Sequence, residues 1–142
     1  MTQEQTLATF TGKCLCGAVS LSFRHTDPHM SACHCNFCRR WGGGPFLTVE
    51  CHQAPDIEGA EHITVFRSSD WAERGFCSRC GTHLFYRLTS QNFYALPAGL
   101  FEKGGDWPFR LQVFIDQKPQ NYNFDAGTKT MTGEEVFKAW GA

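Results

Sequence analysis

Apolar and polar residues alternate along much of the chain, and apolar residues at helical spacing are scarce. Residues 18–23, Ala-Val-Ser-Leu-Ser-Phe, place small or polar side chains between apolar ones, which is the pattern of a half-buried strand. The same alternation predicts further strands at 45–51, 62–67, 82–88, 92–96 and 110–115. Glycine, proline and aspartate clusters separate these segments as turn signals. The pattern therefore predicts a mostly β fold of antiparallel sheets.

Two short segments depart from the alternation and predict helices. Residues 36–41 would form one helical turn that presents Cys38 back toward Cys33 and Cys35. Near the C-terminus, Thr132-Gly133-Glu134-Glu135 is a capping box that opens a short helix through Trp140, with Val136, Phe137 and Trp140 on one face. We expect that helix to pack on the sheet. Because no repeat or linker interrupts the chain, we expect one domain over residues 1–142.

Composition narrows the function classes. The chain has 142 residues, enough for one domain with its own core, and its 42% hydrophobic content excludes a disordered segment. A net charge of −1 disfavours nucleic acid as a partner. No stretch approaches the length of a membrane span, and residues 1–5 lack the basic start of a secretory signal. We expect a cytoplasmic protein with no membrane partner; the sequence carries no signal of its oligomeric state.

Seven of the eight cysteines fall into three clusters, and Cys51 stands alone. In a reducing compartment clustered cysteines indicate metal binding, and thiolates in this number select zinc, Cu(I) or iron–sulfur centres. Zinc is the simplest choice, because a C-x-C pair and a C-x-x-C pair together complete a closed tetrahedral site. The triplet would then hold a second zinc with one coordination position open. The alternative is one zinc plus a reduced thiol cluster. The clusters are Cys14-Leu15-Cys16, Cys33-His34-Cys35-Asn36-Phe37-Cys38 and Cys77-Ser78-Arg79-Cys80.

The order and spacing of these clusters resemble the glutathione-dependent formaldehyde-activating enzyme (GFA) family, also called the centromere-protein-V-like domain. The matching stretches are Gly12-Lys13-Cys14-Leu15-Cys16-Gly17-Ala18-Val19, Cys33-His34-Cys35-Asn36-Phe37-Cys38-Arg39-Arg40 and Phe76-Cys77-Ser78-Arg79-Cys80-Gly81-Thr82. The resemblance covers about residues 10–120 and leaves 121–142 as a C-terminal extension. It implies the Mss4-like β-tent fold, in which antiparallel sheets are pinned by zinc.

The resemblance also implies ligands and a reaction. A structural zinc would take Cys14, Cys16, Cys77 and Cys80, and a second, labile zinc would take Cys33, Cys35 and Cys38. The family's name reaction joins glutathione and formaldehyde as S-hydroxymethylglutathione and is classified with carbon–sulfur lyases. Two departures place the substrate in question: Lys118 is followed by Pro119-Gln120-Asn121-Tyr122 rather than tryptophan, and the capped helix after Gly127 is additional.

Charge counting favours a thiol as the ligand of the second zinc. Zinc with four thiolates carries −2 and is closed, whereas zinc with three carries −1 and is a poor activator of water. Its better use is to hold an incoming thiol as a thiolate that attacks a small aldehyde, or to run the reverse reaction. Glutathione would be the cosubstrate, and its carboxylates would suit Arg39 and Arg40, with close backbone approach at Gly43. Alternatively, the arginines offset the negative cluster and the glycines only make a turn.

Several other residues have two interpretations. His34 is a candidate proton shuttle, although between two ligands its side chain more naturally points away from the metal. Cys51 is either a small buried apolar residue or a fourth ligand. We expect His52, His62 and His83 to be surface or core residues, and Trp41 and Phe46 to wall the pocket.

Three function classes compete with a thiol-handling enzyme. A non-catalytic zinc-stapled binding module of the same fold is the first, but it would need only the closed site. A methionine sulfoxide reductase would want a late cysteine, and none follows Cys80. A nucleic-acid zinc protein is disfavoured by the near-zero charge.

Overall fold

The computed structural model describes residues 6–125 and 127–140, which form eleven strands, two α-helices and four short 3-10 helices. Among the described helices, none has the length and apolar character needed to cross a bilayer. The strands are β1 (Ala8–Lys13), β2 (Ser20–His25), β3 (Met30–Cys33), β4 (Phe46–Cys51), β5 (Asp56–Glu58), β6 (Ile63–Arg67), β7 (Ala72–Cys77), β8 (His83–Leu88), β9 (Phe93–Pro97), β10 (Phe109–Val113) and β11 (Lys129–Met131). The helices are α1 (Asn36–Gly42) and α2 (Gly133–Trp140), with 3-10 turns η1 (Ala60–His62), η2 (Ala98–Leu100), η3 (Glu102–Asp106) and η4 (Ile115–Gln117).

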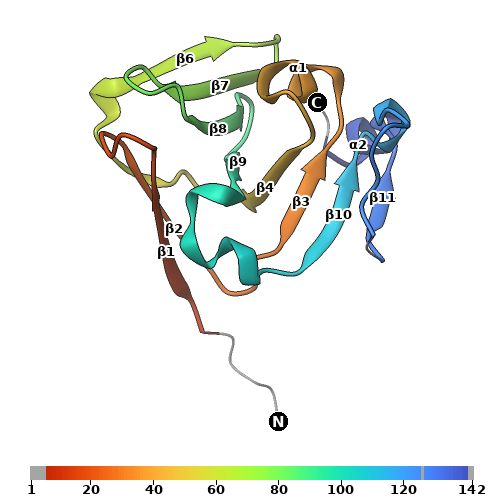
Figure 1. Ribbon diagram of the computed structural model, residues 1–142, viewed down its shortest axis with the longest axis horizontal. Coiled ribbons are helices and arrows are strands. Elements are labelled where there is room, and N and C mark those ends of the chain that lie inside the picture. The colour runs from red at the N-terminus through yellow and green to blue at the C-terminus, as the bar shows by residue number, and fades with distance from the viewer. Residues whose placement is uncertain (1–5, 126, 141–142) are drawn as a thin grey trace.

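The strands build two sheets of unequal size. The small sheet has the order β1-β2-β5, and the large one has the order β11-β10-β3-β4-β9-β8-β7-β6. Figure 1 shows β6 and β7 running across the top of the large sheet, with β3, β10 and β11 on the right and the small sheet on the left. The predicted mostly β fold with zinc-type cysteine clusters and a short C-terminal helix is confirmed.

Six strands lie within a few residues of their predicted positions, whereas β1, β3, β5, β7 and β11 were not predicted. The large sheet is also mixed rather than wholly antiparallel, because β10 pairs in parallel with both β3 and β11. Parallel strands are joined by long connections, so the local alternation of apolar and polar residues does not predict which strands pair in parallel. This pairing places β10 beside β3, the strand that leads into the cysteine triplet, and β11 on the outer side of β10.

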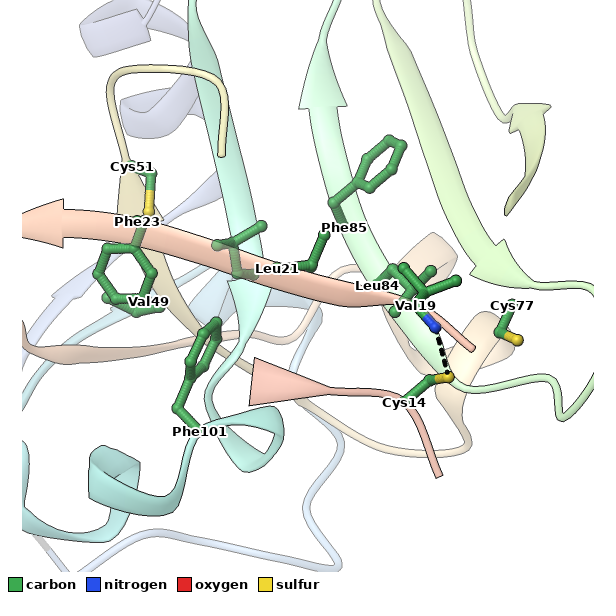
Figure 2. Close-up of a cluster of buried hydrophobic side chains, with 11 residues drawn as sticks. Cys14, Val19, Leu21, Phe23, Val49, Cys51, Cys77, Leu84, Phe85 and Phe101 are labelled. Carbon is green, nitrogen blue, oxygen red and sulfur yellow. Dashed lines mark hydrogen bonds between the residues drawn. The ribbon is translucent and has the colours of Figure 1, made fainter. Parts of the chain in front are cut away.

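The main core fills the space between the two sheets (Figure 2). Leu21 from β2, Val49 from β4, Leu84 from β8 and Leu96 from β9 are fully buried there. Side chains alternate across a strand, so β4 turns Val49 and Cys51 toward this core and Thr48 and Glu50 toward the opposite face. Cys14 and Cys77 are buried in the same core, which therefore continues directly into the first cysteine cluster.

Both predicted helices are present. In α1, Cys35 is the N-cap and its sulfur accepts a hydrogen bond from the Cys38 N–H. At α2 the capping box is reciprocal: the Thr132 N–H donates to Glu135 Oε1 at 3.0 Å, and the Glu135 N–H donates to Thr132 Oγ1 at 3.2 Å. Both helices therefore start where local sequence places them.

Candidate metal centres and an adjoining cavity

The first cysteine cluster joins the small sheet to the large one. Cys14 and Cys16 follow β1, Cys77 ends β7, and Cys80 lies in the next turn. The four sulfurs lie within 4.8 Å of one another, with Cys14 and Cys16 Sγ 3.6 Å apart and Cys16 and Cys77 Sγ 3.8 Å apart. Four thiolates at tetrahedral zinc would lie about 3.8 Å apart, since each Zn–S bond is about 2.3 Å. These residues therefore fit a closed zinc site.

Both pairs sit in turns that are closed by a glycine. A glycine with positive φ follows the second cysteine of each pair, Gly17 at 81° and Gly81 at 78°, and its N–H donates to the carbonyl of the first cysteine. In these turns, N–H and O–H groups also donate hydrogen bonds to the cysteine sulfurs. The Val19 N–H donates to Cys14 Sγ at 3.3 Å (Figure 2), and hydrogen bonds from the Thr82 hydroxyl and N–H lower the pKa of Cys80 to about 5.

The second cluster contains three cysteines at the junction of β3 and α1. Cys33 ends β3, Cys35 caps the helix, and Cys38 is buried on its first turn. Their sulfurs also lie within 4.8 Å of one another, and within the described residues no further Cys, His, Asp or Glu ligand joins them. The Cys33 and Cys38 thiols and the Cys38 N–H hold the pKa of Cys35 well below its usual value, although burial opposes this. The triplet is thus a three-thiolate donor set.

Arg74 brings a buried cation to this cluster. Its side chain projects from β7, is 3% exposed, and donates two N–H groups to Cys38 Sγ at 3.5 and 3.6 Å. The guanidinium also lies 5.1 Å from the ring centres of both Trp41 and Tyr86, and its Nε donates to Ser68. Three thiolates gathered in a low-dielectric site repel one another, so a fixed cation beside them stabilises their anionic form.

A cavity of about 560 Å³ opens beside the triplet, on the face of the large sheet that points away from the main core. The side chains on one face of the large sheet form the floor of this cavity. The strand register places them there: Cys33 pairs with Phe46, Ser31 with Thr48, and Glu50 with Ala95, so these side chains project from the same face. The floor continues through β8 to Arg74 on β7. The helix α2 supplies a wall with Val136, Phe137 and Trp140, the three residues predicted to share one face of this helix.

His34 points into the protein and not toward the cavity. It is fully buried, its Nε2 donates to Gln112 Oε1 at 2.8 Å, and its Nδ1 accepts from the Tyr122 hydroxyl at 2.7 Å. Burial lowers the pKa of His34, so the neutral ring with the proton on Nε2 satisfies both contacts. These contacts do not support the proton shuttle; His34 instead ties the triplet to β10 and the C-terminal segment.

The three residues predicted to bind glutathione have different surroundings. Arg39 lines the cavity, and its Nε donates to the His34 carbonyl at 3.0 Å. Arg40 is exposed and does not line the cavity. Gly43 is the C-cap that follows α1, with φ 86°, and its N–H donates to the Arg39 carbonyl, so it makes a turn. Of the three, Arg39 alone is placed to meet a ligand in the cavity.

The remaining predicted residues lie around the clusters. Phe46 lines the cavity, as predicted; Trp41 is not among its lining residues, and its ring stacks on His83 at 3.7 Å. Cys51 is buried in the main core, at 4% exposure, and joins neither cluster. His52, His62 and His83 also lie outside both clusters.

The sequence interpretation missed Arg74 and Glu50. Arg74 follows buried Ala72 at the two-residue spacing of a strand, which indicates an inward-facing charge once β7 is recognised. Glu50 lines the cavity in phase with Phe46 and Thr48, and that alternation was readable within the predicted strand.

Comparison with known proteins gives a family and a fold. The model of the glutathione-dependent formaldehyde-activating enzyme family matches residues 9–117. An uncharacterized lyase of Schizosaccharomyces pombe is 39% identical over 131 residues, covering 92% of this chain and 96% of that protein. A putative glutathione-dependent formaldehyde-activating enzyme of Halomonas elongata is 34% identical over 85 residues, 52% of this chain and 53% of that protein.

A crystal structure of a Rhodobacter sphaeroides protein shares the fold, with a TM-score of 0.52 and 21% identity, covering 86% of this chain and 99% of that one. The family match spans all three cysteine clusters, and the yeast lyase aligns along nearly the whole chain. The chain therefore belongs to the glutathione-dependent formaldehyde-activating enzyme family.

Proposed function

We propose that this protein is a zinc-dependent enzyme of the carbon–sulfur lyase type that forms or cleaves the adduct of a thiol with an aldehyde. Glutathione is the proposed thiol, and S-hydroxymethylglutathione is one such adduct. The observation that carries the proposal is the contrast between the two clusters. Four cysteines complete one site at the edge of the core, while three cysteines line or adjoin a cavity of about 560 Å³.

Both donor sets suit zinc, and they suit different roles. A complete set of four thiolates leaves no position for substrate, so its role is to hold the two sheets together. The triplet leaves a fourth position for an outside ligand. Zinc held there would supply acidification, because coordination deprotonates a thiol and makes its sulfur available to an aldehyde carbon. In the forward direction the S–H bond and the π bond of the aldehyde carbonyl break, one C–S bond forms, and the thiol proton ends on the former carbonyl oxygen.

The residues of this chain prepare the site in two ways. Arg74 offsets the negative charge of the triplet through its contacts with Cys38, which favours the thiolate forms. Arg39 lines the cavity beside Cys35 and Asn36, where its guanidinium can pair with a carboxylate of glutathione. The cysteines would stay reduced in the cytoplasm, the compartment we propose.

The test is zinc content combined with zinc X-ray absorption, with and without glutathione. We expect two zinc ions per chain, and a mean sulfur coordination that rises from about 3.5 to about 4 per zinc when the thiol binds. Partial loss of one zinc to excess thiol would equally mark a labile, thiol-responsive site. The matched variants are Cys35→Ser, which should abolish the response to glutathione, and Cys51→Ser, which should retain it.

One zinc per chain that glutathione leaves unchanged, with the triplet thiols free to alkylating reagents, would overturn the proposal. That result would favour a non-catalytic zinc-stapled binding module. Activity is measured separately, as acceleration of exchange between glutathione, formaldehyde and their adduct by two-dimensional exchange NMR.

A further inference from the structure

The cavity beside the triplet extends well beyond the cysteines and ends in a polar group. We propose that the aldehyde partner is bulky and mainly apolar, and that it carries a hydrogen-bond donor at its far end that binds Glu50 and Ser31. This inference rests on the proposed function, and it concerns which aldehyde the site accepts.

Cavity size is the first observation. Formaldehyde has two heavy atoms and occupies the space of about one or two water molecules, each about 30 Å³. The cavity measures about 560 Å³, within the range of sites that enclose much larger small molecules. A single-carbon aldehyde would leave most of this space to water, whereas an aryl or long acyl group would fill it.

The walls are the second observation, because they are aromatic on several sides. Phe46 and Phe93 belong to the floor strands β4 and β9, while Phe137 and Trp140 project from α2. Trp71 packs edge-to-face against Phe137, and so does Phe114. Burial of apolar surface and offset contacts between rings both favour an apolar, planar guest over the polar backbone of glutathione.

The polar group at the far end is the third observation. Along β4, Glu50 is four residues from Phe46, which pairs with Cys33 at the triplet, so the backbone runs about 13 Å from Phe46 to Glu50 at about 3.3 Å per residue. Ser31 pairs with Thr48 on the same face, and its side chain is 3% exposed. Its hydroxyl has no hydrogen-bond partner among the described residues.

A buried hydroxyl without a partner is unfavourable, and a carboxylate turned toward an aromatic cavity has lost much of its water. A guest that ends in a hydroxyl or an ammonium group would satisfy both. A hydroxyl would donate its one hydrogen to a carboxylate oxygen and accept from the Ser31 hydroxyl, whereas an ammonium group would donate to both. The separation of about 13 Å then sets the length of the guest. Its aldehyde carbon would lie at the triplet, where the C–S bond forms, and its donor group at Glu50.

Binding of unreactive alcohols tests this without requiring any chemistry at the cysteines. The probes are 3-phenylpropan-1-ol, its 4-hydroxy and 4-aminomethyl derivatives, and propan-1-ol, titrated calorimetrically into the zinc-loaded protein. We expect each aryl alcohol to bind at least tenfold more tightly than propan-1-ol. We expect the preferred 4-substituted compound to bind about tenfold more tightly than its parent. Which derivative is preferred distinguishes a hydroxyl from an ammonium donor.

Variants of residues that line the cavity test whether the aryl alcohols bind there. Glu50→Gln and Ser31→Ala should each remove most of the preference for the 4-substituted compound, and Ala95→Leu should weaken all aryl alcohols by narrowing the floor beside Glu50. Glu102→Gln, an exposed residue outside the cavity, is the matched control and should change nothing. Circular dichroism confirms that each variant is folded.

Aryl alcohols that bind no better than propan-1-ol, or a 4-substituent preference that survives Glu50→Gln, would overturn the inference. Exchange NMR with glutathione separates this outcome from failure of the proposed function. Accelerated exchange of formaldehyde without aryl binding would leave the proposed function standing and reject the bulky aldehyde. Aryl binding without acceleration of any thiol–aldehyde exchange would reject the proposed function and keep the cavity assignment.

Discussion

The guanidinium of Arg74 donates two N–H groups to the sulfur of Cys38, at 3.5 and 3.6 Å, although 36 positions separate the two residues. Arg74 is held there by the rings of Trp41 and Tyr86 and by Ser68. The contact couples β7, which ends in the four-cysteine cluster, to the helix that carries the three-cysteine cluster. The strand β7 thus contributes Cys77 to one candidate metal site and the cation Arg74 to the other.

Replacement of Arg74 should weaken metal binding at the triplet. In Arg74→Gln the thiolates lose a buried cation, so protons compete more strongly with zinc at neutral pH. By analogy with other residues that contact metal ligands, we expect the dissociation constant of the second zinc to rise about 10–100-fold. Competition with a chromogenic chelator measures this constant.

The control for this prediction is Arg24→Gln, since Arg24 is exposed on β2, in the small sheet. Both zinc ions should bind to this variant as to the wild type. If Arg74→Gln also retained both affinities, the cation would have no part in holding the triplet as thiolates.

The two clusters should differ in their effect on stability. In Cys77→Ser the buried core loses a ligand of the closed site, and we expect the thermal midpoint to fall by about 10 °C or more with loss of one zinc. In Cys35→Ser one zinc should also be lost, but the midpoint should fall by less than half as much, because Cys35 caps a short helix beside an open cavity. Scanning calorimetry with parallel zinc analysis compares them; equal shifts would contradict separate roles.

Local features of this fold could be predicted from sequence, because they depend on residues a few positions apart. The turns around Cys14–Gly17 and Cys77–Gly81 follow from cysteine spacing and a following glycine, and the capping box at Thr132 and Glu135 fixes the start of α2. The four-cysteine and three-cysteine sets were inferred from cysteine spacing and from the family resemblance, and the structure brings the same sets together.

The composition of the cavity could not be predicted in the same way. Ser31, Glu50 and Arg74 meet on one face only because β3, β4 and β7 occupy particular positions in the large sheet. Strand order and register depend on long-range pairing, and a shift of one residue would turn each side chain to the opposite face. His34 illustrates the same limit: its partners Gln112 and Tyr122 lie on segments that reach it through parallel pairing of β10 with β3.

Cys51 should prove inert toward metal and toward alkylation. Burial, with a smaller contribution from Glu50, raises the pKa of Cys51 to about 12, so the thiol stays protonated at pH 8. Iodoacetamide labelling of the native protein, read by peptide mass spectrometry, should leave this residue unmodified. Cys51→Ser should keep full zinc content while losing about 1–3 kcal/mol of stability, because a hydroxyl replaces a thiol in an apolar core. Loss of one zinc equivalent would instead identify Cys51 as a ligand.

Because Glu50 is half-buried, we expect its ionisation to lower the stability of the folded protein as pH rises. Burial raises the pKa of Glu50, whereas the neighbouring His29 and His52 oppose the shift. A carboxyl with a raised pKa in the folded state contributes stability that is fully present below its unfolded pKa of about 4.3 and is lost as pH rises through the folded pKa. Glu50→Gln removes that loss, so we expect the variant to have a higher thermal midpoint than the wild type at pH 7–8. The gap should narrow as pH falls toward 5, with zinc content verified at each pH. A gap that stayed constant from pH 8 to pH 5 would show that Glu50 titrates as it does in the unfolded chain, and its place in the cavity would then be well hydrated.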